Sequence, residues 1–344
     1  MRAHIRSLSL LLLGLAASAA PALCQPADFD VTEAAHGVYA VIAKPGIASN
    51  GAFIVNQDDV VVVDTHLRPS WAREIIAEIK KVTDKPVRYI INTHWHRDHV
   101  QGNQAYIAAY GPGVTIIQQD LAREDQIKNQ PVEIVTRAPE EIARLEKLLS
   151  SGQNEKGVPL TAAGRVQLQH ALDLQKAYVA EIPQIQLVPG NLTFDHSLVL
   201  HEAGRDICLY YYGYGHSRGD AIVYLPAEKI VLTGDVLESG VPLMRSAYPV
   251  EWLGVLESIE KLDWNTVIPG HGGIQHDRQT IKGFAAYLTD LVAGVKQAAA
   301  KGLTSDETVK SVDLSKYSSM PNYDDRNADA IRRTYAEVTG KISN

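Results

Sequence analysis

Four side chains that can bind a metal ion lie within six positions of one another near the first third of the chain. They are His94, His96, Asp98 and His99, and they directly follow a largely apolar run at residues 87–92. Three later segments, at residues 215–220, 232–235 and 268–272, each add one further candidate, namely His216, Asp235 and His271. Seven donors of this kind are enough for a site that holds two metal ions.

The spacing of the first four candidates divides them between two ions. Alternate residues of an extended loop point to the same side, so His94 and His96 can share one ion. Asp98 and His99 can then turn toward a second ion about 3.5–4 Å away, the separation typical of two-metal hydrolytic sites. Imidazole nitrogen and carboxylate oxygen are both donors that zinc accepts. Asp235 is the candidate for a carboxylate that bridges the two ions.

The motif at residues 94–99 and the later His, Asp and His resemble the metallo-β-lactamase superfamily, whose ligands occur in this order. The resemblance spans roughly residues 36–275. It implies a first ion bound by His94, His96 and His216, and a second bound by Asp98, His99 and His271, with Asp235 between them. It also implies two Zn²⁺ ions per chain, with iron or manganese left open as alternatives. Asp64 and Asp220 resemble the carboxylates that orient the ligands in this family.

The implied chemistry is hydrolysis. A hydroxide held between two zinc ions forms near neutral pH and needs no Ser or Cys nucleophile. Asp98 is expected to orient it and to carry its proton, which makes Asp98 the catalytic candidate. Asp235 and an exported chain favour a small carbonyl-type substrate, a β-lactam, lactone, ester or amide, over a phosphodiester. An iron-dependent sulfur dioxygenase and a non-catalytic metal-binding accessory protein remain as alternatives on the same fold.

The first 24 residues have the pattern of a secretory signal peptide. Arg2 and Arg6 precede an apolar stretch at residues 8–17, and small residues follow. We therefore expect a periplasmic or secreted protein that has no membrane-spanning segment in its mature form. The formal net charge of −7, without a Lys and Arg cluster in the mature chain, argues against a nucleic-acid partner. The sequence does not predict an oligomeric state.

Apolar runs and turn residues predict an α/β fold. The resemblance specifies it as a four-layer αββα sandwich, whose domain we place at residues 30–275 and whose helical C-terminal extension we place at residues 276–344. Short strands are expected at residues 38–42, 52–55, 60–63, 87–92, 198–200, 207–212, 221–224, 230–232 and 267–268. A helix that begins near Pro69 should bury Ile75, Ile76, Ile79 and Val82.

A helical hairpin is expected as an insertion at about residues 121–183. Pro139 should begin its first helix, which residues 151–152 end, and Thr161 or a neighbour should begin the second. The insertion separates the two halves of the ligand set. It is interpreted as a lid or wall of the substrate site, as a cover for apolar surface, or as a dimerisation arm.

Overall fold

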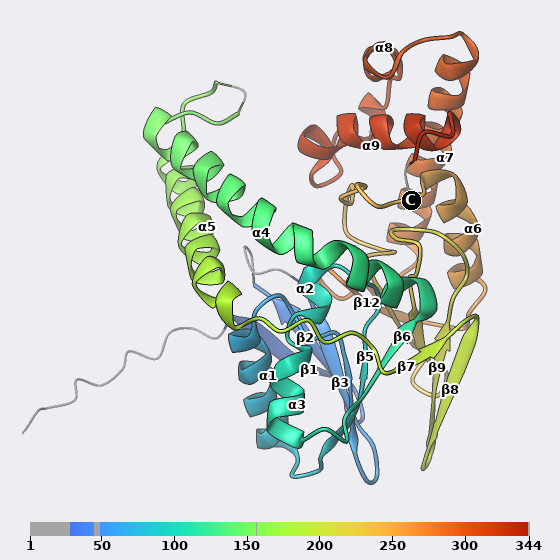
Figure 1. The fold of residues 1–344 in the computed structure, drawn as a ribbon. Helices are drawn as coiled ribbons and strands as arrows, with labels where there is room; N and C mark the ends of the chain where they lie inside the picture. Colours follow the sequence, from blue (N-terminus) through green and yellow to red (C-terminus); the bar gives the residue numbers. More distant parts are fainter. Residues whose placement is uncertain (1–27, 45–48, 156, 343–344) are drawn as a thin grey trace, which may run out of the picture.

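Two β-sheets form the centre of the protein (Figure 1). The computed structural model describes residues 28–44, 49–155 and 157–342, so the predicted signal peptide lies outside the described residues. The first sheet runs in chain order through β1 (Phe29–Ala35), β2 (Val38–Ala43), β3 (Gly51–Val55), β4 (Val60–Val63), β5 (Val87–Ile91), β6 (Thr115–Gln119) and β7 (Leu192–Phe194). The second has the order β12-β11-β10-β9-β8, formed by β8 (Ser197–Glu202), β9 (Arg205–Tyr210), β10 (Ile222–Leu225), β11 (Ile230–Gly234) and β12 (Thr266–Pro269).

The valine run of β4 shows why the sheets pack into layers. All four of its residues are buried. Because successive side chains of a strand point to opposite faces, Val61 and Val63 pack between the two sheets. Val60 and Val62 pack outward against α1 (Pro69–Val82). A strand buried on both faces reads as a continuous apolar run, as β4 does.

Helices cover the outer face of each sheet, which confirms the four-layer αββα sandwich. The first sheet is covered by α1 and α3 (Asn103–Tyr110), and the second by α6 (Pro249–Glu260), α7 (Gln279–Ala300) and α9 (Tyr323–Val338). The remaining short helices are α2 (Arg97–Val100), α8 (Ser305–Ser311), η1 (Ile182–Gln184) and η2 (Ser315–Tyr317). Ile75, Ile76 and Ile79 are buried as expected, but the prediction for Val82 is wrong. Val82 is the last residue of α1 and is 42% exposed.

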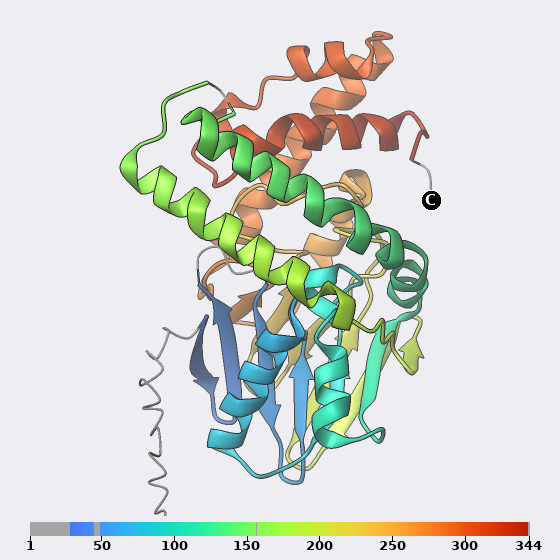
Figure 2. The ribbon, with the colours of Figure 1, turned by 60° about the vertical axis from the view of Figure 1, so that its left-hand side comes forward.

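The insertion is a helical hairpin, formed by α4 (Asp120–Ser151) and α5 (Ala162–Glu181), which extends beyond the sandwich (Figure 2). Gly152, in the left-handed conformation, ends α4, and the side chain of Thr161 caps α5, both as predicted. The predicted start at Pro139 is wrong, because α4 begins at Asp120 and runs through Pro139. The Gln119 side chain caps that start by accepting hydrogen bonds from the amides of Leu121 and Ala122.

Two physical effects explain the longer helix. A proline inside a helix removes one backbone hydrogen bond and costs about 3 kcal/mol. Packing of α4 against α5 offsets this cost, since Ala138 and Leu145 are buried on either side of Pro139. Glutamine is also not among the preferred residues at a helix N-cap, so Gln119 gave no start signal.

Close contact between α4 and the segment that carries His216 fixes the base of the hairpin. Gly219 has no side chain, and a Cβ there would overlap the backbone of Ala122 in the first turn of α4. Beside it, Arg218 forms an ion pair with Asp125 of α4, with Nη2 2.6 Å from Oδ1. The insertion is therefore anchored to the second half of the ligand set.

We expect Gly219→Ala to lower the free energy of unfolding by about 1–3 kcal/mol, the usual cost of overpacking a close contact. The matched control is Gly113→Ala, because a Cβ at Gly113 meets no atom of the described chain within 4 Å. Chemical denaturation of both variants measures the difference. Equal stability of the two would show that α4 does not depend on this contact.

The C-terminal helices hold the long loop between β11 and α6. Arg333 of α9 donates from Nε to the carbonyl oxygen of Ala247 at 2.6 Å. Glu337 of the same helix accepts from the amide of Val250 at 3.0 Å. The extension thus packs against the segment that follows Asp235, rather than forming a separate body.

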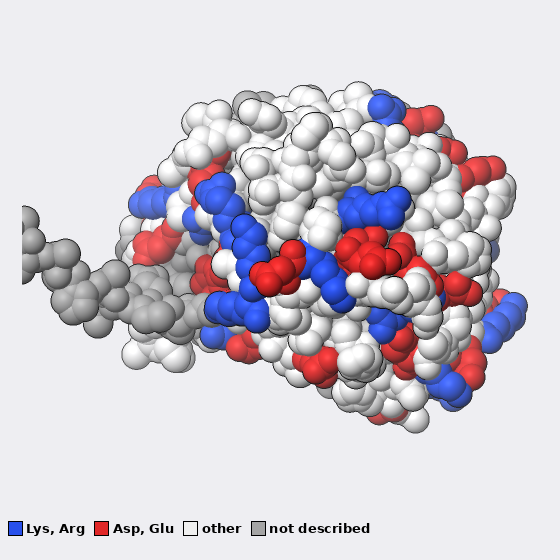
Figure 3. All heavy atoms as spheres, turned by 90° about the horizontal axis from the view of Figure 1, so that it is seen from below, with Lys and Arg blue, Asp and Glu red and all other residues white. Residues whose placement is uncertain are grey.

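On the face in Figure 3, Lys and Arg side chains are interspersed with Asp and Glu. Among the helices that the structure describes, none is both long enough and apolar enough to cross a membrane.

Candidate metal centre

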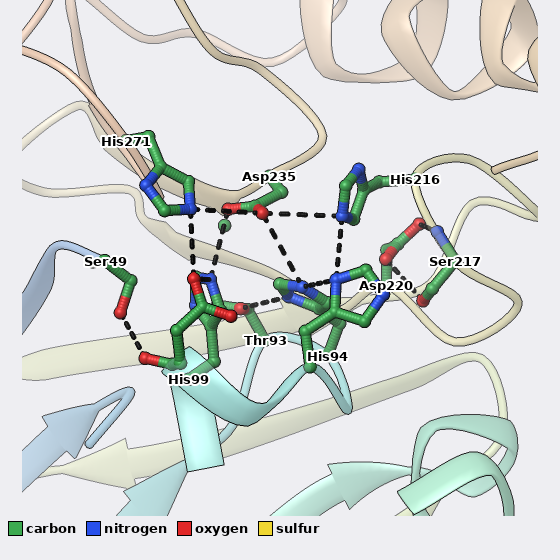
Figure 4. A network of polar contacts seen from close by, with 12 residues as sticks. Ser49, Thr93, His94, His99, His216, Ser217, Asp220, Asp235 and His271 are labelled. Atoms are coloured by element: carbon green, nitrogen blue, oxygen red, sulfur yellow. Dashed lines mark hydrogen bonds and ion pairs between the residues drawn. The ribbon is translucent and has the colours of Figure 1, made fainter. Parts of the chain in front are cut away.

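The seven predicted ligands converge at one edge of the sandwich, where four loops meet (Figure 4). The loop after β5 supplies His94 and His96, and the short helix α2 that follows supplies Asp98 and His99. The loop after β9 supplies His216, Asp235 follows the end of β11, and the loop after β12 supplies His271. Loops at strand ends can take irregular conformations while the strands hold them rigidly. The fold therefore brings residues 94 and 271 together across the two sheets.

One cluster consists of His94, His96, His216 and Asp235. His96 Nδ1 lies 2.9 Å from His94 Nε2 and 3.0 Å from His216 Nε2. Asp235 Oδ2 lies 3.4 Å from His216 Nε2. Four donors at 2.0–2.1 Å from a tetrahedral zinc ion stand about 3.3 Å apart. The cluster has the composition and the spacing of such a site.

A second cluster consists of Asp98, His99 and His271. His271 Nε2 lies 3.3 Å from Asp98 Oδ2, and His99 Nε2 lies 3.6 Å from the same oxygen. Asp235 reaches this cluster too, with Oδ1 3.2 Å from His99 Nε2 and Oδ2 3.4 Å from His271 Nε2. Asp235 therefore stands where a bridge between two ions would stand.

Two buried atoms at this junction test whether the residues fit a cation. His99 Nε2 and Asp235 Oδ1 lie 3.2 Å apart, yet within the described residues neither atom makes a hydrogen bond of good geometry. Leaving such atoms unsatisfied away from water costs about 1–3 kcal/mol each, and more for charged groups. A divalent ion between them removes that cost, so the donor set fits a metal.

Asp64 hydrogen-bonds the segment at residues 93–99, which carries four of the candidate ligands, as the sequence suggested. Its Oδ1 accepts from the amide of Thr93 at 2.8 Å, and its Oδ2 accepts from His99 Nδ1 at 2.7 Å. Asp64 has a φ of 59°, a conformation that costs a non-glycine residue energy and is retained where the surroundings demand it. Because Nδ1 of His99 donates to Asp64, Nε2 is left to bind a cation.

Asp64→Asn is expected to weaken metal binding at the second cluster by about 10- to 100-fold, the range for loss of a carboxylate that orients a His ligand. Binding at the first cluster should weaken less, because Asp64 reaches that cluster through the Thr93 hydroxyl, which lies 3.1 Å from His94 Nδ1. Asp59→Asn is the matched control, since Asp59 is equally buried but hydrogen-bonds Asn56 at the other end of β4. Titration with a chelator that competes for zinc measures both affinities. Identical affinities in the two variants would contradict the role assigned to Asp64.

Two further residues orient ligands of the first cluster. Asp220 accepts from the amide and the hydroxyl of Ser217, at 2.8 and 2.6 Å, and so fixes the turn that presents His216. Burial raises the pKa of Asp220 to about 7. The sequence pattern did not single out Ser246. Its Oγ lies 2.7 Å from His96 Nε2 and donates to the His216 carbonyl oxygen at 3.3 Å.

The pKa values of the imidazoles are shifted in opposite directions in the two clusters. It lowers the pKa of His94 and His96 well below the usual value and that of His216 to about 4, so these imidazoles are neutral at pH 7 and can bind a cation directly. Burial also lowers the pKa of His99, but the nearby carboxylates Asp235 and Asp64 outweigh it and raise that pKa well above the usual value. A cation at the second cluster therefore replaces a proton on His99.

Solvent reaches Asp98 and His271 of the second cluster and His96 of the first, while His99 is buried. The side chains of Asp98 and His271 are 26% and 32% exposed, whereas those of His94 and His216 are 1% exposed. A substrate would thus meet Asp98, His271 and His96 first.

The insertion directly contacts the segment at residues 95–101, which carries three of the candidate ligands. Gln130 of α4 donates to the carbonyl oxygen of Trp95 at 2.8 Å. Tyr178 of α5 donates to Gln101 at 3.1 Å and packs under the guanidinium of Arg97. The hairpin therefore supports the loop that carries the ligands, as well as extending past it.

An αββα sandwich with two adjoining His and Asp clusters at its strand ends defines a class of metal-binding proteins. Residues 45–271 match the family model described as the metallo-beta-lactamase superfamily, which is more than half of the chain. The chain belongs to this superfamily.

Comparison with individual proteins finds distant relatives. A linear primary-alkylsulfatase of a Pseudomonas species is 22% identical over 275 residues, which cover 75% of this chain and 48% of that protein. A type 2 metallo-beta-lactamase of Bacteroides fragilis is 20% identical over 276 residues, covering 74% of this chain and 86% of that one. A solved double mutant of a sec-alkyl sulfatase has a TM-score of 0.64 at 16% identity, covering 91% of this chain and 51% of that one. The chain spans about half the length of the alkyl sulfatases.

Proposed function

We propose that the protein is an exported hydrolase that binds two zinc ions and acts on a carbonyl-type substrate, such as a β-lactam, lactone, ester or amide. The observation that carries the proposal is the position of Asp235. Its two oxygens lie within 3.8 Å of nitrogens in both His clusters. The superfamily and its hydrolase relatives support an enzymatic role.

When bound, two divalent ions polarise the substrate and make water a nucleophile near neutral pH. Side chains of the protein orient the water and accept its proton. Asp98 is the carboxylate of the centre that reaches solvent, so it can orient water and accept a proton at Oδ. Ser49 donates to the Asp98 backbone carbonyl and holds this residue in place. The buried Asp235 stays a negative charge between the clusters.

The test is turnover by the mature protein, first stripped of metal and then reloaded with zinc. Chromogenic β-lactams, lactones and aryl esters form the panel. We expect hydrolysis of at least one class, lost with a chelator and lost in His216→Ala. A protein with two zinc ions that turns over no carbonyl substrate would contradict the proposal. A single iron per chain, with oxygen consumption on a persulfide, would instead support a sulfur dioxygenase.

Hydrolysis of alkyl sulfate esters is a second candidate, favoured by the two alkyl sulfatase relatives. Alkyl sulfates of different chain length, added to the same panel, distinguish the two candidates. Sulfate release without carbonyl hydrolysis would select the second.

Export and partners are part of the proposal. Cleavage after Ala22 or Cys24 would release a periplasmic or secreted protein, and mass spectrometry of the mature N-terminus tests it. The substrate is the partner we propose, with no nucleic acid and no membrane.

A further inference from the structure

A third carboxylate lies beside the second cluster. Glu238 follows Asp235 by three positions, on the loop after β11, and is only 6% exposed. One of its oxygens lies within 4.8 Å of ligand-capable atoms of both Asp235 and His271. The ligand motif of the sequence does not include it.

The C-terminal extension holds Glu238 without saturating it. Arg326 of α9 places Nη1 3.5 Å from Glu238 Oε2, and the same nitrogen donates to the carbonyl oxygen of Val241 at 3.1 Å. Charge-assisted hydrogen bonds between guanidinium and carboxylate are usually 2.7–2.9 Å long. A carboxylate has about four lone-pair sites. Glu238 therefore retains acceptor capacity for a second cation.

The carboxylates around His271 favour the binding of such a cation. Asp98, Asp235 and Glu238 bring three carboxylates around His271, and the groups that face them are the imidazoles of His99 and His271 and the guanidinium of Arg326. Like charges buried this close are costly unless cations or hydrogen bonds compensate them. Asp235 Oδ1 is buried without a hydrogen-bond partner in the described part of the chain. A metal ion shared by these oxygens resolves both problems.

Glu238 also changes the chemistry of the second position. The first cluster offers three imidazole nitrogens and one carboxylate, a set that suits four-coordinate zinc. With Glu238, the second offers three carboxylates (Asp98, Asp235 and Glu238) and two imidazoles (His99 and His271). Carboxylate-rich sites of higher coordination number suit manganese. We propose that Glu238 is a fifth protein donor to the second position and lets it retain manganese(II), an inference that rests on the two-metal function proposed above.

The experiment uses the full mature chain, loaded with one equivalent of zinc and titrated with Mn²⁺ alone. Free Mn²⁺ is followed by its paramagnetic resonance signal, and zinc content by elemental analysis. We expect Glu238→Gln to weaken manganese binding about tenfold or more, with zinc content unchanged. The matched control is Glu228→Gln, because Glu228 pairs with Arg205 at 2.7 Å at the opposite end of β11.

A further variant separates a donor from a structural ion pair. Arg326→Gln removes the partner of Glu238, and it should retain manganese affinity even where its unfolding temperature falls. Equal manganese affinity in wild type and Glu238→Gln, in a protein that binds two metals, would overturn the inference. Loss of manganese binding in Arg326→Gln equal to that in Glu238→Gln would overturn it too. A wild-type chain that binds no metal at either position would instead sink the proposed function.

Discussion

Asp98→Asn is expected to reduce turnover by on the order of 10²-fold or more, the range typical for loss of acid–base function. The substitution keeps the shape of the side chain but removes its charge and its ability to take a proton. Asp98 is the exposed carboxylate of the centre and lies 3.3 Å from His271 Nε2. The measurement is kcat per bound metal, at saturating zinc, on whichever substrate the panel identifies.

Dividing by bound metal matters because Asp98 is also a proposed ligand. The control is Asp263→Asn, a surface carboxylate that is 77% exposed and pairs with Lys229. The control should keep wild-type turnover. Near wild-type turnover of Asp98→Asn with both metals bound would show that Asp98 is not catalytic.

Asp235→Ala is expected to abolish measurable turnover and to lower the metal content from two ions per chain to one or fewer. Its carboxylate lies 3.2 Å from His99, and 3.4 Å from both His216 and His271, so it serves both clusters. His271→Ala is the informative comparison, since His271 lies in the second cluster. That variant should lose one ion. Two retained ions in Asp235→Ala would contradict a bridging role for Asp235.

The grouping of the seven candidate donors could be predicted from the sequence because much of its geometry is local. Four of the seven donors lie within six residues after an apolar strand, and strand ends gather at the same edge of a sheet. The valine run of β4 likewise predicts a strand that is buried on both faces. Asp64 was found for the same reason, since it directly follows that strand.

Other features depend on contacts that no local pattern records. Ser246 reaches His96, and Glu238 reaches His271, because α9 holds the loop after β11 in place. The start of α4 was missed because Gln119 is an unusual cap and tertiary packing outweighs the cost of Pro139. The short edge strand β7, only three residues long, gives too little pattern to recognise.

Contacts of the hairpin with the ligand-bearing segment limit how it can be shortened in a test of whether it is a wall of the site. Replacing residues 139–180 with a linker, to test whether the insertion is a wall of the site, would also remove Tyr178. The Tyr178 hydroxyl bonds Gln101 beside the ligand loop. A deletion that leaves both Tyr178 and Gln130 in place keeps the support of the ligand-bearing segment while shortening the hairpin.

The number of metal ions per chain tests the central claim most directly. Mature protein, stripped and reloaded with zinc and freed of loosely bound ions, is measured by elemental analysis beside His271→Ala. We predict two ions per wild-type chain and one in the variant, because Asp235 and six further donors form two adjoining clusters. One ion or fewer in the wild type, or two in His271→Ala, would contradict a two-metal centre.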